Sequence, residues 1–430
     1  WSRTSMHPLD ILFAVVSAAC ALYIVVNYQE LVLRAGMNNE TDFVVGLVGT
    51  FMVFEAARRV VGWPMITVAF CFMVYACFGP YIPGILAHRG VEIQEMFDHL
   101  FFTTEGIFGT PMGVSSTFIY LFILFGAYLE TTGLGKFFID IANAIAGWAA
   151  GGPAKVAVLS SGLMGTVSGS SVGNVAGTGA FTIPKKKKLG YRPEFAGAVE
   201  AAASTGGQLM PPVMGAAAFL MAEFVGVPYF DVVKAAVIPA LLYYIGVWLG
   251  VHYEAKKYDL KGTPREELPS FKKLFVEKGH LALPLIVIVY LLVSGFTPMR
   301  AALAAILLSI VCASLRASTR ITFKQGVQGL IDGSMGVLGV LIACATAGII
   351  IGVVTKTGVG LKVATALLDL SGGALLPAMF FTMITSLILG MGVPTTANYV
   401  ITSTIAAPAL VQMGVPVLAA HMFAFYFGIV

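Results

Sequence analysis

The sequence predicts an all-α polytopic membrane protein, a fold class indicated by its composition, its recurring apolar runs and the polar breaks inside two of those runs. Of the 430 residues, 58% are hydrophobic and only 11% are charged, whereas a soluble domain carries roughly 25% charged residues. A helix needs about 20 apolar residues to cross a bilayer, and such runs recur along the chain. No stretch alternates polar and apolar residues as a barrel strand would, so helices are expected.

The longest apolar runs mark the helices that we expect to cross the bilayer. They are residues 9–33, 43–61, 64–86, 111–131, 194–224, 228–251, 281–297, 299–316 and 335–354. The first run leads directly into further spans, so we interpret it as a membrane helix and not as a cleaved signal peptide. Two more apolar stretches, 153–184 and 375–411, have polar centres. We predict that each is a re-entrant hairpin, which enters and leaves the membrane on the same side.

The distribution of basic residues predicts the orientation of these spans. With the N-terminal residues, including Arg3, in the cytoplasm, most of the 26 Lys and Arg residues fall in cytoplasmic segments, as the positive-inside rule requires. The exceptions are Arg34, Arg89, Lys234, Arg300, Lys356 and Lys362. If the stretch 153–184 crossed the membrane once, every later loop would invert and this asymmetry would weaken. The charged segment 252–280 is expected to be a solvated cytoplasmic connector.

An internal repeat relates the two broken stretches. Residues 224 positions apart are identical at Asn174 and Asn398, Thr178 and Thr402, Pro184 and Pro408, and Gly190 and Gly414. Upstream, Thr132-Gly-Leu-Gly135 matches Thr357-Gly-Val-Gly360 at nearly the same separation. The predicted topology gives the two copies opposite orientations, and inverted repeats with broken helices are typical of secondary transporters. The same separation would place a second copy of Pro211-Pro212 beyond Val430, so we expect the second repeat to continue past that residue.

Three polar elements interrupt apolar helices at membrane depth. They are Ser168-Gly-Ser-Ser171 with Asn174, Ser204-Thr-Gly-Gly-Gln208 with Pro211-Pro212, and Gly390-Met-Gly-Val-Pro-Thr-Thr396 with Asn398. Gly and Pro free backbone carbonyl groups from the helix, and such groups are tolerated at this depth where they line a cavity or bind a ligand. Neutral oxygens suit a monovalent cation such as sodium, and helix N-termini suit an anionic substrate. The alternative is that these small residues simply allow close helix packing.

Ionisable residues within the expected spans are further candidates. Glu200 lies one turn before the break at Ser204, and His421 falls in the second repeat. Glu55 precedes Arg58 and Arg59 by three and four residues, which favours a structural ion pair on one helix face. No nucleophile lies beside a base, no cluster has metal-ligand spacing and no Walker motif is present. The sequence therefore supports neither an enzyme nor an ATPase, and it indicates no nucleic-acid partner.

Long ordered segments of the chain resemble a known family. They include GNVAGTGAFTIP, LGYRPEFAGAVEAAASTGGQLMPPVMGAAAFLMAEFVGVPY, GMGVPTTANYV and APALVQMGVPVLAAHMFAFYFGIV, together with EAARRVVGW and LFFTTEGIFGTPMGVSSTFIYLFILFGAYLE. These segments resemble the fused permease of tripartite ATP-independent periplasmic (TRAP) transporters. One departure is the run Lys185 to Lys188, where relatives are commonly more apolar after the Ile-Pro pair; it fits a cytoplasmic exit.

The resemblance implies a domain organisation. Residues 1–105 would be the small-subunit-like helices, which act as a scaffold and of which a first helix is expected to be missing. Residues 106–430 would be the large, elevator-type transport region. Its first repeat would cover about 107–250 and its second about 330–430, with the loop 252–280 between them.

The resemblance also implies a sodium-driven importer of small organic acids in the bacterial inner membrane, supplied by an extracytoplasmic substrate-binding protein and without an ATPase subunit. It places sodium at Ser168, Gly169, Ser171, Thr205, Gly206, Gly390, Gly392 and Thr395. The substrate would be bound by Ser170, Asn174, Gln208, Pro211, Pro212, Thr395, Thr396 and Asn398.

Two alternative functions remain open at this point. One is a proton-coupled carrier that uses Glu200 or His421, and the other is a channel or a non-transporting membrane scaffold. The sequence does not identify the substrate, because no Arg or Lys lies inside the broken elements to bind a carboxylate.

Overall fold

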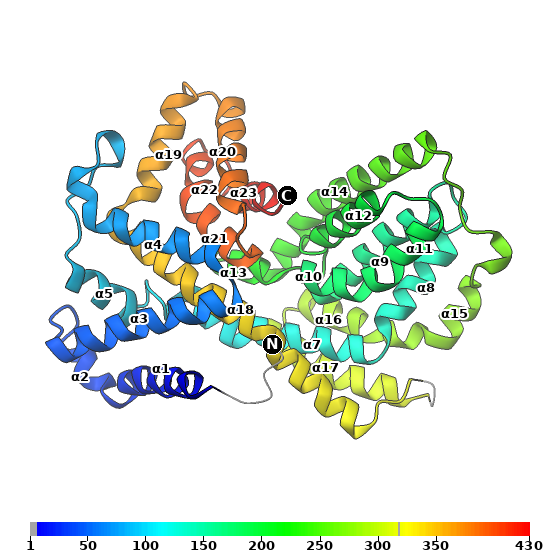
Figure 1. Ribbon diagram of the computed structural model, residues 1–430, viewed down its shortest axis with the longest axis horizontal. Coiled ribbons are helices and arrows are strands. Elements are labelled where there is room, and N and C mark those ends of the chain that lie inside the picture. Colours follow the sequence, from blue (N-terminus) through cyan, green and yellow to red (C-terminus); the bar gives the residue numbers. More distant parts are fainter. Residues whose placement is uncertain (1–6, 317–318) are drawn as a thin grey trace. The chain divides into compact units, whose positions relative to one another are not determined.

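The computed structural model describes residues 7–316 and 319–430, and within them it contains helices and connecting loops but no β-strand (Figure 1). Six of its helices are long and apolar enough to cross a membrane. The residues divide into two compact units, one made of 1–116 with 338–430 and the other of 117–337. These observations confirm the prediction of an all-α, multi-pass membrane protein. The proposed boundary between residues 105 and 106 stays a prediction.

The first unit combines the N-terminal helices with the last part of the chain. Its helices are α1 (Pro8–Val26), α2 (Tyr28–Leu33), α3 (Glu40–Val60), α4 (Trp63–Phe78), α5 (Ile93–Phe102), α6 (Thr110–Val114), the end of α18 (Phe323–Thr357), α19 (Val359–Leu370), α20 (Leu375–Gly390), α21 (Thr395–Ile405), α22 (Ala407–Gln412) and α23 (Val417–Ile429). Short 3-10 turns at Gly79–Tyr81 and Gly84–Leu86 follow α4.

The second unit contains the first broken stretch. Its helices are α7 (Tyr120–Thr131), α8 (Leu134–Ala146), α9 (Gly152–Ser168), α10 (Ser171–Asn174), α11 (Ala180–Lys188), α12 (Pro193–Gly206), α13 (Ala216–Val225), α14 (Tyr229–Lys257), α15 (Phe271–Lys278), α16 (Leu283–Val293), α17 (Pro298–Ser314) and the start of α18. Turns of π-helix at Ser115–Ile119 and Val175–Gly179 join α6 to α7 and α10 to α11.

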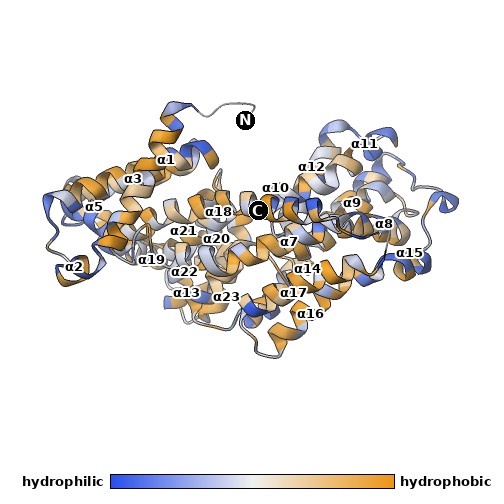
Figure 2. Cartoon of the chain, turned by 90° about the horizontal axis from the view of Figure 1, so that it is seen from below, coloured by the Kyte–Doolittle hydropathy of each residue, from blue (hydrophilic) through white to orange (hydrophobic). Residues whose placement is uncertain are grey.

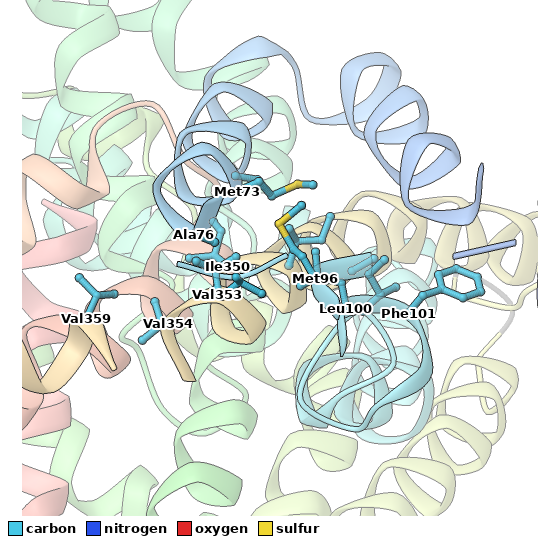
Figure 3. Packing of buried hydrophobic residues seen from close by; sticks show 14 of the residues in the cluster. Met73, Ala76, Met96, Leu100, Phe101, Ile350, Val353, Val354 and Val359 are labelled. Atoms are coloured by element: carbon cyan, nitrogen blue, oxygen red, sulfur yellow. The ribbon is translucent and has the colours of Figure 1, made fainter. Parts of the chain in front are cut away.

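A buried apolar cluster connects the early and late helices of the first unit. Met73 and Ala76 of α4 pack with residues of α5, α18 and α19 (Figure 3). Leu100 and Ile350, from two of these helices, are fully buried. Because burying one large aliphatic side chain contributes about 1.5–3 kcal/mol, this cluster is sufficient to hold segments that lie far apart in the sequence.

Apolar side chains also cover the outer surface of several helices. Figure 2 shows hydrophobic residues along α1, α16 and α17, whereas α15 is strongly hydrophilic. On α1, Leu22 is 59% exposed and Val26 is 78% exposed. An apolar helix with this much exposed surface needs a lipid environment, since soluble monomers rarely expose such large apolar patches.

Several expected spans differ from the observed helices. The run 194–224 is not one helix, because α12 ends at Gly206 and α13 begins at Ala216. The Gly and Pro residues between them prevent a continuous helix. The run 335–354 belongs to the longer helix α18, and the sequence analysis missed α5, α8 and α19, whose mixed polar and apolar faces conceal them from a search for uniformly apolar runs.

Both broken stretches form helical hairpins. In the first, α9 packs against α10 and α11; in the second, α20 packs against α21 and α22. The second arms begin at Ser171 and Thr395, and the helices that follow them begin at Pro193 and Val417. Each of these pairs is 224 residues apart, so the helix boundaries follow the same separation as the sequence repeat. The opposite orientation of the two hairpins in a membrane stays a prediction.

Two predictions about charged residues have different outcomes. Glu55 accepts hydrogen bonds from Arg58 at 2.8 Å and from Arg59 at 2.6 Å, which confirms the ion pair on one helix face. The run Lys185 to Lys188 is not uniformly exposed, because the Lys186 side chain is 0% exposed; the cytoplasmic exit expected for this run stays a prediction. Arg3, used in the orientation argument, lies outside the described residues.

Candidate functional site

The tip of the first hairpin is a tight turn between α9 and α10. Helix α9 ends at Ser168 and is followed by Gly169, whose φ of 56° lies in the left-handed region that favours glycine. The next residue, Ser170, caps α10, and its hydroxyl oxygen accepts a hydrogen bond of 3.1 Å from the Gly173 backbone N–H. A side chain on Gly169 would collide with the backbone of Met214. The tip therefore lies directly against the loop that follows α12.

Gln208 fixes that loop to the hairpin. Its Nε2 donates a 2.8 Å hydrogen bond to Oγ of Ser171. The hydroxyl of Tyr229, at the start of α14, donates to two carbonyl oxygens of the same loop, that of Pro212 at 3.0 Å and that of Val213. The structure thus brings together predicted residues from two of the three polar elements, 168–171 and 204–212.

Glycine residues let the backbone of α9 approach the end of α12. A Cβ atom on Gly207 would lie 2.9 Å from Cα of Gly165 and 3.1 Å from Nδ2 of Asn174. Asn174 is fully buried, and its Nδ2 donates a 2.8 Å hydrogen bond to the Ser161 carbonyl oxygen. Its amide oxygen Oδ1 is therefore the group left to accept a bond or to bind a cation.

Four buried side-chain oxygens near the first hairpin have no hydrogen-bond partner within the described part of the chain. They are Oγ of Ser168, Oδ1 of Asn174, Oγ of Ser204 and Oε1 of Gln208. Buried polar atoms are normally paired, so each of these oxygens is available to bind a water molecule or an ion. All four belong to the two elements that meet at this hairpin.

The second hairpin also contains a buried asparagine with a free amide oxygen, but its amide donates to the helix that follows the hairpin and not to the first arm. Asn398 of α21 donates from Nδ2 to the Gly428 carbonyl oxygen, and a Cβ atom on Gly390 would lie 3.1 Å from the same Nδ2. Oδ1 of Asn398 is buried without a partner among the described residues, as are the hydroxyl oxygens of Thr382 and Ser386. One helical turn after each asparagine, a threonine hydroxyl donates to the backbone carbonyl oxygen of that asparagine. Thr178 donates to Asn174 at 2.8 Å, and Thr402 donates to Asn398 at 2.9 Å.

The remaining predicted residues occupy different environments. The Thr205 hydroxyl donates to the Ala201 carbonyl oxygen at 2.9 Å, within its own helix. Gly206 faces the ring of Tyr243, where a Cβ atom would lie 2.5 Å from the ring, and this contact fits the close-packing alternative. Thr396 is buried. Five predicted residues at the second tip or in the proline loop are partly or fully exposed: Pro211, Pro212, Gly390, Gly392 and Thr395.

The sequence analysis missed residues that complete the first hairpin. Ser204 supplies one of the unpaired oxygens, although only the break that begins there was noticed. Glu200 was considered as an isolated ionisable residue, whereas Lys186, Ser161, Thr178 and Thr182 all donate to its carboxylate. One signal could have revealed this group, since Asn174, Thr178, Thr182 and Lys186 recur at every fourth position and so share one helix face.

The family profile described as "Tripartite ATP-independent periplasmic transporter, DctM component" matches residues 48–430. The chain is 32% identical over 191 residues to the C4-dicarboxylate TRAP transporter large permease protein DctM of Pseudomonas aeruginosa, covering 44% of each chain. It is 26% identical over 185 residues to the sialic acid TRAP transporter large permease protein SiaM of Vibrio cholerae, covering 42% of each.

A relative with a longer match is the isethionate TRAP transporter permease protein DctMQ of Oleidesulfovibrio alaskensis. It is 26% identical over 308 residues, which cover 69% of this chain and 46% of the relative. The matches thus span about half the length, or less, of these curated relatives.

Proposed function

Because the chain belongs to the family of DctM components of tripartite ATP-independent periplasmic transporters, we propose that it is the membrane permease of a sodium-driven importer of small organic acids. The family is one of transporter permeases and not of enzymes, as the sequence analysis expected. In this proposal an extracytoplasmic binding protein delivers the substrate, and the two hairpins move it across the inner membrane by an elevator type of alternating access.

The observation that carries the sodium proposal is the set of unpaired buried oxygens at both hairpins. Ser168, Asn174, Ser204 and Gln208 offer neutral side-chain oxygens at the first hairpin, and Asn398 offers one at the second. Hard cations prefer oxygen ligands, and broken helices in transporters bind sodium through such groups near the membrane midplane. The described residues contain no group of three or more His, Cys, Asp or Glu that could hold a transition metal.

The names of the relatives support an organic anion as the substrate. The relatives in Pseudomonas aeruginosa, Vibrio cholerae and Oleidesulfovibrio alaskensis are named for C4-dicarboxylate, sialic acid and isethionate. All three compounds carry a carboxylate or sulfonate group. The N-terminus of α21, at Thr395, adds partial positive charge beside the second tip, which favours a negatively charged ligand.

The test is uptake by the purified permease in liposomes, with the binding protein of the same operon loaded with each of the three compounds. Sodium-dependent uptake of at least one compound is expected, and uptake that persists without a sodium gradient would contradict the coupling. Ser204→Ala removes one unpaired oxygen and should raise the sodium concentration for half-maximal uptake about 5–100-fold, equivalent to about 1–3 kcal/mol. Ser309→Ala is the control, because that buried hydroxyl already donates to Ile306 at 2.7 Å.

Proton coupling through Glu200 or His421 is the competing proposal. Glu200 lies 2.9 Å from Nζ of Lys186, and His421 lies 2.8 Å from the hydroxyl of Tyr399. The Glu200 carboxylate accepts hydrogen bonds from four neighbouring side chains, which favours a structural role over that of a proton carrier. A Glu200→Gln variant that keeps pH-dependent uptake would count against the proton carrier. Steady current in bilayers without substrate would instead favour a channel.

A further inference from the structure

Helices α11 and α12 are joined by an ion pair that is completely removed from solvent. Nζ of Lys186 lies 2.9 Å from Oε2 of Glu200, and both side chains are 0% exposed. Desolvating two charges costs so much that buried pairs are often no more stable than apolar residues of similar size. Stability alone therefore does not account for this pair.

The second hairpin has the same helix boundaries without the charges. At 224 residues from Lys186 and Glu200 the sequence has Leu410 and Ala424, which are also buried. Gly179, where a Cβ atom would lie 3.0 Å from Cγ of Glu200, corresponds to the buried residue Ser403. Buried residues without charge thus occupy all three equivalent positions of the second hairpin.

The carboxylate of Glu200 binds the hydroxyl groups of two residues, Ser161 and Thr178, that also contact Asn174. Oε1 accepts hydrogen bonds from Thr178 and, at 3.2 Å, from Ser161. The Thr178 hydroxyl also lies 2.8 Å from the Asn174 carbonyl oxygen, and the Ser161 carbonyl oxygen accepts the amide hydrogen of Asn174. The backbone and the side chain of Asn174 are thus both fixed by residues that bind Glu200.

We infer that Lys186 and Glu200 form a positioning pair for the first sodium site, an inference that rests on the proposed function. Glu200 binds the hydroxyl groups of Ser161 and Thr178 and so holds α12 against these two residues. The Ser161 carbonyl oxygen then accepts the Asn174 amide hydrogen, which leaves Oδ1 free to bind the ion. Lys186 donates to Oε2 and so holds the carboxylate with Oε1 toward both hydroxyls. Neither residue touches the ion.

The test transplants the residues of the second hairpin into the first. The triple variant Gly179→Ser, Lys186→Leu and Glu200→Ala is expected to keep a melting temperature near that of the wild type, while its sodium half-saturation constant for uptake rises about 10-fold. The maximal rate at saturating sodium should change far less, because the pair does not contact the ion. Lys186→Arg, which preserves the charge, should stay closer to the wild type than Lys186→Met.

Sodium-induced thermal stabilisation of the purified permease provides a second readout that does not depend on transport. The matched control is the exposed ion pair between Arg192, which precedes α12, and Glu254 of α14, joined at 2.8 Å. Its Arg192→Gln and Glu254→Gln double variant should leave sodium affinity unchanged.

A folded triple variant with wild-type sodium affinity would overturn the inference while leaving the proposed function intact. If the triple variant does not fold, equal sodium affinities in Lys186→Met and the wild type would overturn it. Uptake by the wild type that needs no sodium would instead refute the function itself.

Discussion

Gly165 and Gly207 meet backbone to backbone where α9 passes the end of α12. A Cβ atom on Gly207 would lie 2.9 Å from Cα of Gly165 and 3.0 Å from the Ser204 carbonyl oxygen. Both neighbours are main-chain atoms, so neither can turn aside as a flexible side chain would. The contact lies beside Asn174, whose Nδ2 would be 3.1 Å from the same Cβ atom, and the free oxygens of Asn174 and Ser204 belong to the first candidate sodium site.

Replacing Gly207 with Ala should therefore separate the two helices. Overpacking of this kind destabilises a protein by about 1–3 kcal/mol, and the displaced oxygens should also bind sodium more weakly. The measurements are the melting temperature and its increase with added sodium. Gly197→Ala is the control, because a Cβ atom on Gly197 of α12 would meet no neighbouring atom within 4 Å, so the change should be neutral or stabilising. Equal behaviour of the two variants would show that the close contact has no consequence.

Tyr229→Phe should loosen the loop that carries Pro211 and Pro212. The buried hydroxyl of Tyr229 donates to the Pro212 and Val213 carbonyl oxygens, and its loss leaves buried acceptors unpaired at a cost of about 1–3 kcal/mol. A lower melting temperature and a higher KM for substrate are expected. Tyr253→Phe on the same helix is the control, since Tyr253 is 65% exposed. An unchanged KM in Tyr229→Phe would show that this loop does not contribute to substrate binding.

His99 of α5 should make stability depend on pH. Burial, followed by the nearby charge of Lys356, holds the pKa of His99 below its usual value of 6.5, against the opposing effect of Glu105. The folded state thus favours neutral His99, so this contribution is complete above pH 6.5 and is lost as the pH falls below that value. His99→Gln can still donate to the Gly352 carbonyl oxygen, which lies 3.1 Å from Nε2 of His99. Between about pH 7.5 and about pH 5.5 the melting temperature of His99→Gln should fall less than that of the wild type. An equal fall in both proteins would show that His99 does not cause the pH dependence.

The sequence predicted the hairpins well because their signals are local. Gly and Pro at 390–394 and the Ser-Gly pair at 168–169 interrupt two apolar stretches, and the sequence repeat aligns these two interruptions. The re-entrant course of each hairpin in a membrane stays a prediction. The amphipathic helices α8 and α19 were missed, because a search for uniformly apolar runs does not detect a helix with only one apolar face.

The ion-pair partner of Glu200 could not be predicted from the sequence, because the pairing depends on how the helices pack. A run of four lysines resembles a solvated loop, and nothing in the residue pattern indicates how far Lys186 lies from α12. The helix spacing of Asn174, Thr178, Thr182 and Lys186 does place them on one face. That spacing cannot show which element packs against the face, and only the packing of α12 brings Glu200 to it.

Substitutions of Asn398 in the second hairpin can separate the role of its amide donor, Nδ2, from the role of its amide oxygen, Oδ1. Asn398→Ala removes both the hydrogen bond to Gly428 and the free oxygen Oδ1, so it should lower the melting temperature and weaken stabilisation by sodium. Asn398→Asp also loses the donor but retains two oxygens. It should be destabilised at least as much without sodium, because an unpaired carboxylate is costly to bury, and should then recover strongly as sodium is added. Asn27→Ala is the control, since the Asn27 amide donates to the Tyr23 carbonyl oxygen at 2.9 Å outside both hairpins. If Asn398→Ala and Asn398→Asp respond equally to sodium, Oδ1 of Asn398 does not bind the ion.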